Sequence, residues 1–224
     1  MAESAKTLVP KFFDETGTTY DGVVSYGTLG KDKYWKRKML EQISDGSSFL
    51  DLACGTGILT REIAEKFPNS KIVGIDITKS YLDVAKKNSS YFENISFILD
   101  DAEEFKLDSK FDCITASYLP KYCDPEILVK NCTTHLKPGG KIIFHDFTYP
   151  KNLVVRGLWN LFLTSLRLVG CFIPSWKDAL IGLPKLIRRT KWLESYSDVM
   201  KKNGLSVNRQ YLTCGASAIL TGTK

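Results

Sequence analysis

The chain has 224 residues, of which 43% are hydrophobic and 25% charged, values typical of a soluble globular domain with a complete core. Its six cysteines form no Cys-x-x-Cys pair and no cluster with histidine, which argues against a metal site and a disulfide scaffold and favours free thiols in the cytoplasm. The net charge of +6 is concentrated in residues 151–192, with eight basic residues and one acidic residue, so a local anionic or membrane contact is expected rather than nucleic-acid binding.

Residues 1–45 form an aromatic-rich segment that several glycines interrupt. Asp32 is expected to cap a helix with Tyr34, Trp35 and Met39 on its apolar face. We predict short helices joined by flexible turns, which form an N-terminal lid over a ligand site. The alternative is ordinary packing of the N-terminal segment without a ligand.

Strands and helices alternate between residues 46 and 150. Strands are predicted at 48–52, 71–75, 95–99, 111–116 and 141–144. Helices are predicted at 58–67, 79–88 and 124–135, and the sequence Lys-Pro-Gly-Gly at 137–140 is expected to break the chain. Repeated βα units with short connections predict a parallel sheet with helices on both faces. Residues 46–150 are therefore the predicted ligand-binding core.

The alternation stops after Pro150. Residues 153–173 are long and apolar enough to span a bilayer, but Arg156 and Arg167 make a transmembrane helix unfavourable. We predict that residues 151–191 form a basic, apolar helical insertion, divided at Ile173-Pro174 and at Leu183-Pro184. It either packs on the substrate side of the protein or lies on a membrane surface.

The chain closes with a predicted helix at 192–202 and strands at 206–212 and 216–222. Because three residues separate these strands, they must be antiparallel and complete the sheet at one edge. The predicted fold class is α/β. It is a Rossmann-like, seven-stranded, mostly parallel sheet with an antiparallel terminal hairpin, helices on both faces and helical lid insertions. Residues 1–224 are predicted to be one domain, which 192–224 complete.

Residues 49–57, Phe-Leu-Asp-Leu-Ala-Cys-Gly-Thr-Gly, lead from an apolar strand into a glycine-rich turn that precedes a helix. This is the first half of a nucleotide-binding βα unit. A dinucleotide fingerprint needs a third glycine where Thr60 stands, so NAD is disfavoured. The stretch from Asp51 to Gly57 resembles motif I of the class I methyltransferases that use S-adenosylmethionine.

Three further strand ends support this cofactor. Asp76 ends the second strand, where a carboxylate can accept both ribose hydroxyls. Asp101, followed by Ala102, comes after the third strand, where a carboxylate can accept from the adenine amino group, and Asp100 is the neighbouring alternative. Ser117 follows the fourth strand, beside the methionine moiety. An acidic rim suits the sulfonium and ammonium of S-adenosylmethionine and would repel a pyrophosphate.

The resemblance covers nearly the whole chain, from about Phe12 to Thr221. Six segments fall in the order seen in the ubiquinone/menaquinone C-methyltransferase family: 19–21, 34–37, 51–57, 111–115, 136–140 and 211–215. The resemblance implies methylation of a ring carbon of an isoprenoid-tailed quinone precursor. It implies cofactor contacts at the glycine turn and the strand ends, with Tyr20 closing from the lid. The predicted cofactor-binding residues are Tyr20, Asp51, Ala53, Gly55, Thr56, Gly57, Asp76, Ile77, Asp101, Ala102 and Ser117.

One stretch departs from the family where its chemistry is expected. Leu119-Pro120-Lys121-Tyr122 stands where the family has Gly-Leu-Arg-Asn, whose Arg and Asn are implicated in the reaction. Lysine keeps the positive charge of arginine but not its planar fork. The acceptor is therefore open between a quinone precursor, a related polyprenyl aromatic carrier and another lipophilic molecule.

Methyl transfer is an in-line displacement, so the enzyme must align its substrates and exclude water. A phenol-like acceptor must also lose its proton. We hypothesise that His145 or Asp146, at the end of the fifth strand, acts as the base or orients the acceptor. Tyr118, Lys121 and Tyr122 would form the opposite wall. The alternatives are a structural strand-end histidine and a turn-forming aspartate, and no metal is expected.

The predicted function is methyl transfer from S-adenosylmethionine to a lipophilic aromatic small molecule. Two alternatives stay open. One is N- or O-methylation of a phospholipid head group or natural product, and the other is a non-catalytic cofactor-binding subunit. The expected location is the cytoplasm, with peripheral membrane contact through residues 151–191. The oligomeric state is left open, a homodimer included, and nucleic acid is not an expected partner.

Overall fold

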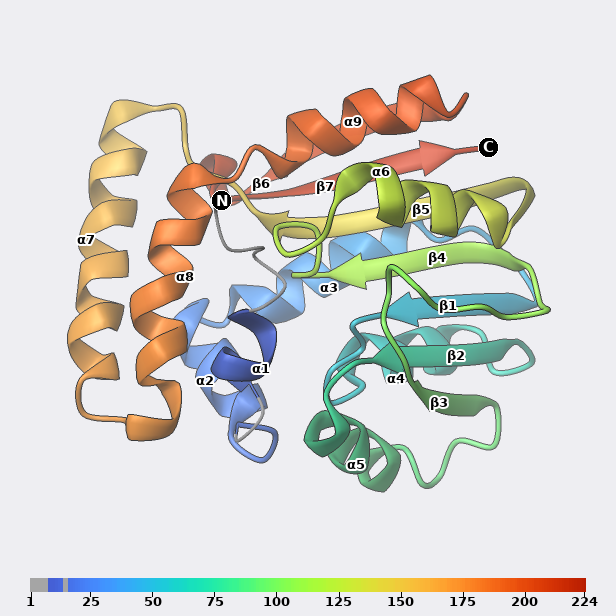
Figure 1. Ribbon diagram of the computed structural model, residues 1–224, viewed down its shortest axis with the longest axis horizontal. Coiled ribbons are helices and arrows are strands. Elements are labelled where there is room, and N and C mark those ends of the chain that lie inside the picture. Colours follow the sequence, from blue (N-terminus) through green and yellow to red (C-terminus); the bar gives the residue numbers. More distant parts are fainter. Residues whose placement is uncertain (1–7, 14–15) are drawn as a thin grey trace.

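The computed structural model describes residues 8–13 and 16–224 of the chain. A seven-stranded sheet lies at its centre in the order β3-β2-β1-β4-β5-β7-β6 (Figure 1). The neighbours among β1 to β5 pair in parallel, whereas β7 is antiparallel to both β5 and β6. This confirms the predicted fold class. The strands are β1 (Ser48–Leu52), β2 (Lys71–Asp76), β3 (Ile95–Leu99), β4 (Phe111–Ser117), β5 (Leu136–Phe147), β6 (Ser206–Leu212) and β7 (Ser217–Thr223).

Both faces of the sheet are apolar because successive side chains of a strand point to opposite sides. In β1, Phe49 packs into the cluster on one face and Leu50 into the cluster on the other. The first face is covered by α3 (Lys31–Gln42) and α4 (Ile58–Lys66), and the second by α6 (Pro125–Thr134) and α9 (Trp192–Lys202). With α5 (Lys79–Asn88) beside β3, the helices leave the carboxyl ends of the parallel strands for a ligand.

Four helices lie together beyond these carboxyl ends (Figure 1). They are α1 (Leu8–Phe13) and α2 (Tyr20–Gly27) from the N-terminal segment, and the hairpin of α7 (Leu153–Gly170) and α8 (Lys177–Arg189). They share an apolar cluster of their own, in which Phe12 of α1 packs with Leu163 of α7 and Leu180 of α8. The two predicted insertions therefore form one lid, although residues 1–7 and 14–15 of the predicted segment 1–45 lie outside the described residues.

The predicted break at 137–140 is accommodated inside a strand. β5 begins at Leu136, which pairs with Phe111, and the register then shifts so that Lys141 pairs with Cys113. The extra residues bulge out of the ladder, and Gly139 adopts a φ of +74° that favours glycine. The other six strands begin and end within one residue of the predicted positions.

Two local predictions are wrong. α8 continues through Pro184, where a division was expected, and burial of the proline ring offsets the lost backbone hydrogen bond. Asp32 is not the cap of α3. Gly30 holds that position in the left-handed region, and Asp32 lies in the first turn and points toward Tyr118.

Candidate active site

The turn after β1 is built on two glycines in the left-handed region. Gly55 has a φ of +57°, and Gly57, the residue before α4, has a φ of +78°. A Cβ atom at Gly57 would also lie 3.2 Å from Arg61 and 3.3 Å from both Ala85 and Phe97. Any other residue at 57 would be strained and crowded. The glycines thus allow β1 to turn sharply into α4.

A cavity lies at the carboxyl ends of β1 to β4, under α1, α2 and α8. Eight of the predicted cofactor residues line it: Tyr20, Ala53, Gly55, Asp76, Ile77, Asp101, Ala102 and Ser117. Its wall is apolar except for a few polar groups, among which carboxylates stand at the ends of β2 and β3. In the described residues no cluster of His, Cys, Asp and Glu is arranged to hold a metal ion.

Asp76 fits the predicted ribose contact. Its side chain is 7% exposed and lines the cavity, and its two oxygens accept from the amides of Gly55 and Thr78, both at 2.8 Å. Burial raises the pKa of Asp76, and these amide hydrogen bonds oppose the shift. The Thr78 hydroxyl and the Ile77 amide also stabilise the charged form. The carboxylate is therefore fixed in place at the cavity wall, in the position predicted for a ribose contact.

The neighbouring carboxylates of Asp100 and Asp101 both line the cavity after β3. Asp100 accepts from the Asp101 amide at 2.8 Å, and Asp101 accepts from the Glu103 amide at 2.9 Å. Together with Asp76 they give the cavity an acidic rim at the ends of β2 and β3. Both remain candidates for the adenine contact.

Three predicted cofactor residues, Asp51, Thr56 and Gly57, are not part of the cavity wall. Asp51 is 2% exposed and accepts from Thr60 at 2.7 Å and Thr115 at 2.8 Å. Thr60 stands where a dinucleotide fingerprint would have its third glycine, and its hydrogen bond to Asp51 stabilises the turn. Thr56 donates to Asp21 of α2 at 2.5 Å, a contact that ties the lid to the glycine turn.

Asp51 predicts a measurable pH dependence of stability. Burial raises its pKa from the usual 3.8 to about 6, so the folded protein binds this proton more tightly than the unfolded chain. The free energy of unfolding should fall, on account of Asp51, as the pH rises through this range. Asp51→Asn should gain about 3 kcal/mol on the wild type between pH 4 and pH 7. Urea unfolding at a series of pH values tests this, and parallel curves for the two proteins would contradict it.

Aromatic side chains close the cavity from the lid. The Tyr20 ring lies 4.9 Å from that of Tyr81 on α5 and stacks 6.1 Å from that of Trp176. Trp176 Nε1 donates to Thr19 at 2.9 Å, which holds the start of α2 against the α7–α8 hairpin. Sequence analysis missed Tyr81 and Trp176 as lining residues. Tyr81 follows Asp76 by five residues, in the first turn of α5, and this position could have predicted it as a lining residue. Nothing in the sequence singles out Trp176.

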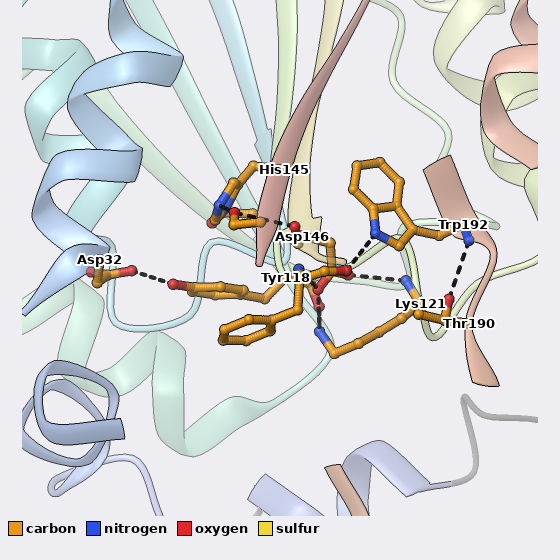
Figure 2. Close-up of polar contacts among 10 residues, drawn as sticks. Asp32, Tyr118, Lys121, His145, Asp146, Thr190 and Trp192 are labelled. Atoms are coloured by element: carbon orange, nitrogen blue, oxygen red, sulfur yellow. Dashed lines mark hydrogen bonds and ion pairs between the residues drawn. The ribbon is translucent and has the colours of Figure 1, made fainter. Parts of the chain in front are cut away.

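Tyr118 forms the next part of the wall, directly after β4. It is a non-glycine residue with a φ of +66°, a strained conformation of the kind that clusters at functional sites. Its hydroxyl donates to Asp32 at 2.8 Å (Figure 2). Asp32 in turn pairs with Lys36. Burial raises the pKa of Tyr118, with Asp32 adding to the effect. Tyr118 is thereby a neutral hydrogen-bond donor anchored to α3.

Lys121 and Asp146 form a buried ion pair (Figure 2). Lys121 Nζ donates to Asp146 Oδ1 at 2.9 Å, and the Lys121 amide donates to Asp146 Oδ2 at 3.1 Å. Burial lowers the pKa of Lys121 and raises that of Asp146, and each charge offsets the shift of the other. Lys121 lines the cavity, whereas Asp146 lies behind it. The ammonium also stands 4.5 Å from the centre of the Tyr122 ring.

His145 is completely buried between two serines and does not line the cavity. Its Nδ1 lies 3.0 Å from Ser117 Oγ and its Nε2 lies 2.7 Å from Ser217 Oγ. Burial, with nearby Lys36 and Lys121, lowers the pKa of His145 well below 6.5, so the ring is neutral. Any part that His145 or Asp146 takes in a reaction must run through Ser117 or Lys121, which do reach the cavity.

The Tyr122 hydroxyl is buried at the cavity wall and has no hydrogen-bond partner among the described residues. Buried polar groups normally have one, because an unpaired hydroxyl costs about 1–3 kcal/mol. Burial raises the pKa of Tyr122, which keeps the group a neutral phenol. Such a neutral hydroxyl at the wall of a cavity is suited to donate to a ligand oxygen.

This chain matches the family described as "Methyltransferase domain" over residues 43–166. The ubiquinone/menaquinone biosynthesis C-methyltransferase UbiE of Hahella chejuensis is 29% identical, with 96% of this chain and 91% of that protein aligned. A malonyl-acyl-carrier-protein O-methyltransferase of Halalkalibacterium halodurans is also 29% identical, over 87% of this chain and 78% of that protein.

Among solved structures, the plantazolicin methyltransferase BpumL, solved with S-adenosylhomocysteine, has the same fold. It superposes with a TM-score of 0.65 at 13% identity, over 98% of this chain and 95% of that one. The domain match covers more than half of this chain, and the relatives align with most of it. The protein therefore belongs to the methyltransferase domain family and is a class I S-adenosylmethionine-dependent methyltransferase of the UbiE-like family.

Proposed function

We propose that this methyltransferase acts on a ring carbon of a lipophilic aromatic acceptor of the isoprenoid quinone type. The carrying observation is the composition of one cavity wall. The wall is apolar and aromatic, but it includes Lys121, whose ammonium lies 4.5 Å from the centre of the Tyr122 ring, and Tyr122, whose hydroxyl has no partner among the described residues. A hydroxylated ring with an apolar tail matches both parts. The quinone C-methyltransferase name of the Hahella relative supports the same acceptor class.

The residues of the wall divide the work of the reaction. When bound, S-adenosylmethionine supplies an electrophilic methyl carbon on a sulfonium, which departs as a neutral thioether. The acceptor hydroxyl gives its proton to the solvent as the acceptor binds, and Lys121 stabilises the resulting oxygen anion, so that electron density moves into the ring. The ring carbon forms the new bond as the bond from methyl to sulfur breaks. Its own proton then moves to the acceptor oxygen, which restores the aromatic ring and the hydroxyl. Asp146 holds Lys121 in position, and the aromatic lid excludes water.

Tyr122→Phe separates this function from a structural role. Because the hydroxyl has no partner among residues 8–13 and 16–224, its removal should raise the free energy of unfolding by about 1 kcal/mol. It should also lower kcat/KM for the acceptor about tenfold, since the ligand then loses a hydrogen bond. Urea unfolding and steady-state kinetics check the two halves. A variant that is less stable and fully active would contradict the assignment.

The acceptor class itself is tested with S-adenosylmethionine labelled in its methyl group. The purified protein is incubated with a demethylated quinol, with phosphatidylethanolamine and with a small carboxylic acid, and each product is analysed. Label in the quinol alone supports the proposal. Label in the lipid head group or the acid would favour N- or O-methylation, and the O-methyltransferase relative makes the acid arm necessary. Cofactor binding with no labelled product would favour a non-catalytic subunit.

We further propose that the protein works in the cytoplasm and meets its acceptor at a membrane surface. The support is the lid. Leu166 of α7 and Leu180 and Leu183 of α8 line the cavity, so the acceptor side is walled by the most basic and apolar segment of the chain. An isoprenoid tail would be drawn to the same side.

A further inference from the structure

The outer face of α7 is apolar and open to solvent. Leu158, Leu161 and Leu168 are 65%, 69% and 63% exposed, and Val154 and Phe172 continue the row at its two ends. Spacings of three, four and seven residues place Val154, Leu158, Leu161 and Leu168 on one side of the helix, and Phe172 follows just beyond its end. Figure 1 shows α7 at the outer edge of the molecule, with α8 between it and the rest. We call these five residues the α7 stripe. A row of solvated leucines of this length indicates a partner.

Positive charge lies along the α7–α8 hairpin. Arg156 and Arg167 lie about three turns apart on α7, on the side of the helix away from the α7 stripe, and α7 contains no acidic residue. Arg156 donates to the carbonyls of Pro150 and Lys151, both at 3.0 Å, which holds its cationic group at the start of the helix. The neighbouring α8 exposes Lys185, Arg188 and Arg189. Asp178 is the sole acidic residue of 151–192. The partner should therefore be apolar and negatively charged at once.

We infer that α7 docks this protein on an anionic lipid bilayer, with the α7 stripe at the boundary of head groups and acyl chains. Exposed leucines supply the apolar term, and the basic residues of the α7–α8 hairpin are attracted to acidic lipids. The inference gives the proposed function a route for its acceptor. The opposite side of α7 carries Leu166 to the cavity, so a docked lid is both the membrane contact and the cavity wall. An acceptor could leave the bilayer beside α7 without crossing water.

The helix lies in the plane of the membrane. By length and composition α7 could cross one, and only 17% of it is buried inside the protein. However, its inner side packs on α8, where Gly170 leaves no room for a Cβ atom, which would approach Leu180 to 2.8 Å. Crossing would carry the exposed Lys185 and Arg188 of α8 into hydrocarbon, at a cost of about 2.5–3.5 kcal/mol each. If a second copy of the chain covered the α7 stripe, two hairpins that each carry eight basic residues and one acidic residue would meet, and their charges would repel.

Co-sedimentation of the full chain with vesicles tests the docking. One set contains phosphatidylcholine alone and the other adds phosphatidylglycerol. The wild type should bind the anionic vesicles at least about tenfold more tightly than the neutral ones. The triple substitution Leu158→Ser, Leu161→Ser, Leu168→Ser should weaken binding at least about tenfold. The matched control is Tyr91→Ser, Ile127→Ser, at residues 95% and 52% exposed outside the lid, and it should bind as the wild type does.

Three results would overturn the docking: no vesicle binding by the wild type, equal binding by the triple variant, or equal loss in the control. Light scattering covers the rival occupant, since a dimer that the triple substitution dissociates, without vesicle binding, assigns the α7 stripe to a second copy. Turnover of a short-tailed, water-soluble quinol separates docking from function. Turnover without vesicle binding removes the docking alone, and vesicle binding without turnover removes the proposed acceptor alone.

Discussion

Asp76→Ala should weaken the binding of S-adenosylmethionine about 100-fold, as measured by titration calorimetry. The carboxylate is held by the amides of Gly55 and Thr78 and still faces the cavity, so it can accept two ribose hydroxyls without rearranging. Hydrogen bonds to a charged acceptor contribute about 1.5–3 kcal/mol each, which makes this the largest single loss expected at the cofactor.

The substitution also removes partners from two buried amides, so a control must separate binding from folding. A cofactor analogue that lacks both ribose hydroxyls provides it. The wild type should prefer the natural ligand strongly, and Asp76→Ala should bind the natural ligand and the analogue alike. Asp83→Ala on α5, at an exposed ion pair with Lys79, should bind as the wild type does. A variant that keeps the preference for ribose hydroxyls would show that Asp76 does not contact them.

Lys121→Met should reduce turnover about 100-fold and lower the free energy of unfolding by about 3–5 kcal/mol. The stability loss arises because Asp146, which is fully buried, is left as an unpaired charge. Asp146→Asn should destabilise for the converse reason. The double substitution Lys121→Met, Asp146→Asn should lose less stability than the sum of the single losses, since no charge is then stranded.

Turnover should follow a different rule. Because Lys121 is the residue of this pair that reaches the cavity, the double variant should recover stability and remain inactive. Urea unfolding and kinetics on the same four proteins measure both quantities. Additive stability losses would show that the pair acts as two independent residues. Full turnover by the double variant would remove the Lys121 ammonium from the reaction.

The sheet was predictable from sequence because its signals are local. Apolar runs of five or six residues, each followed by a glycine turn or ended by an aspartate at the next residue or the last, specify β1 to β3, and a run of seven that stops before Tyr118-Leu119-Pro120 specifies β4. The antiparallel hairpin follows from the short loop before β7. The polar residues at the strand ends were predictable for the same reason, since parallel strands bring their carboxyl ends to one edge.

The arrangement of Lys121 and Asp146 at the cavity wall could not be predicted in this way. Lys121 and Asp146 meet only because β4 and β5 are neighbours, and the sequence gives no sign that one will face the cavity and the other its partner. Asp51 looked like a ligand contact from its motif, but two threonines from α4 and β4 turn it inward. Trp176 reaches the cavity through packing of the lid, which has no periodic signal.

The most direct measurement is the position of the transferred methyl group. The purified enzyme is given S-adenosylmethionine with a carbon-13 methyl and a demethylated isoprenoid quinol, and the product is examined by NMR and mass spectrometry. We expect a new methyl group bonded to a ring carbon. Lys121→Met and Asp76→Ala should both strongly slow the formation of this product. A methyl on a ring oxygen, or a quinol recovered unlabelled while another acceptor takes the label, would contradict it.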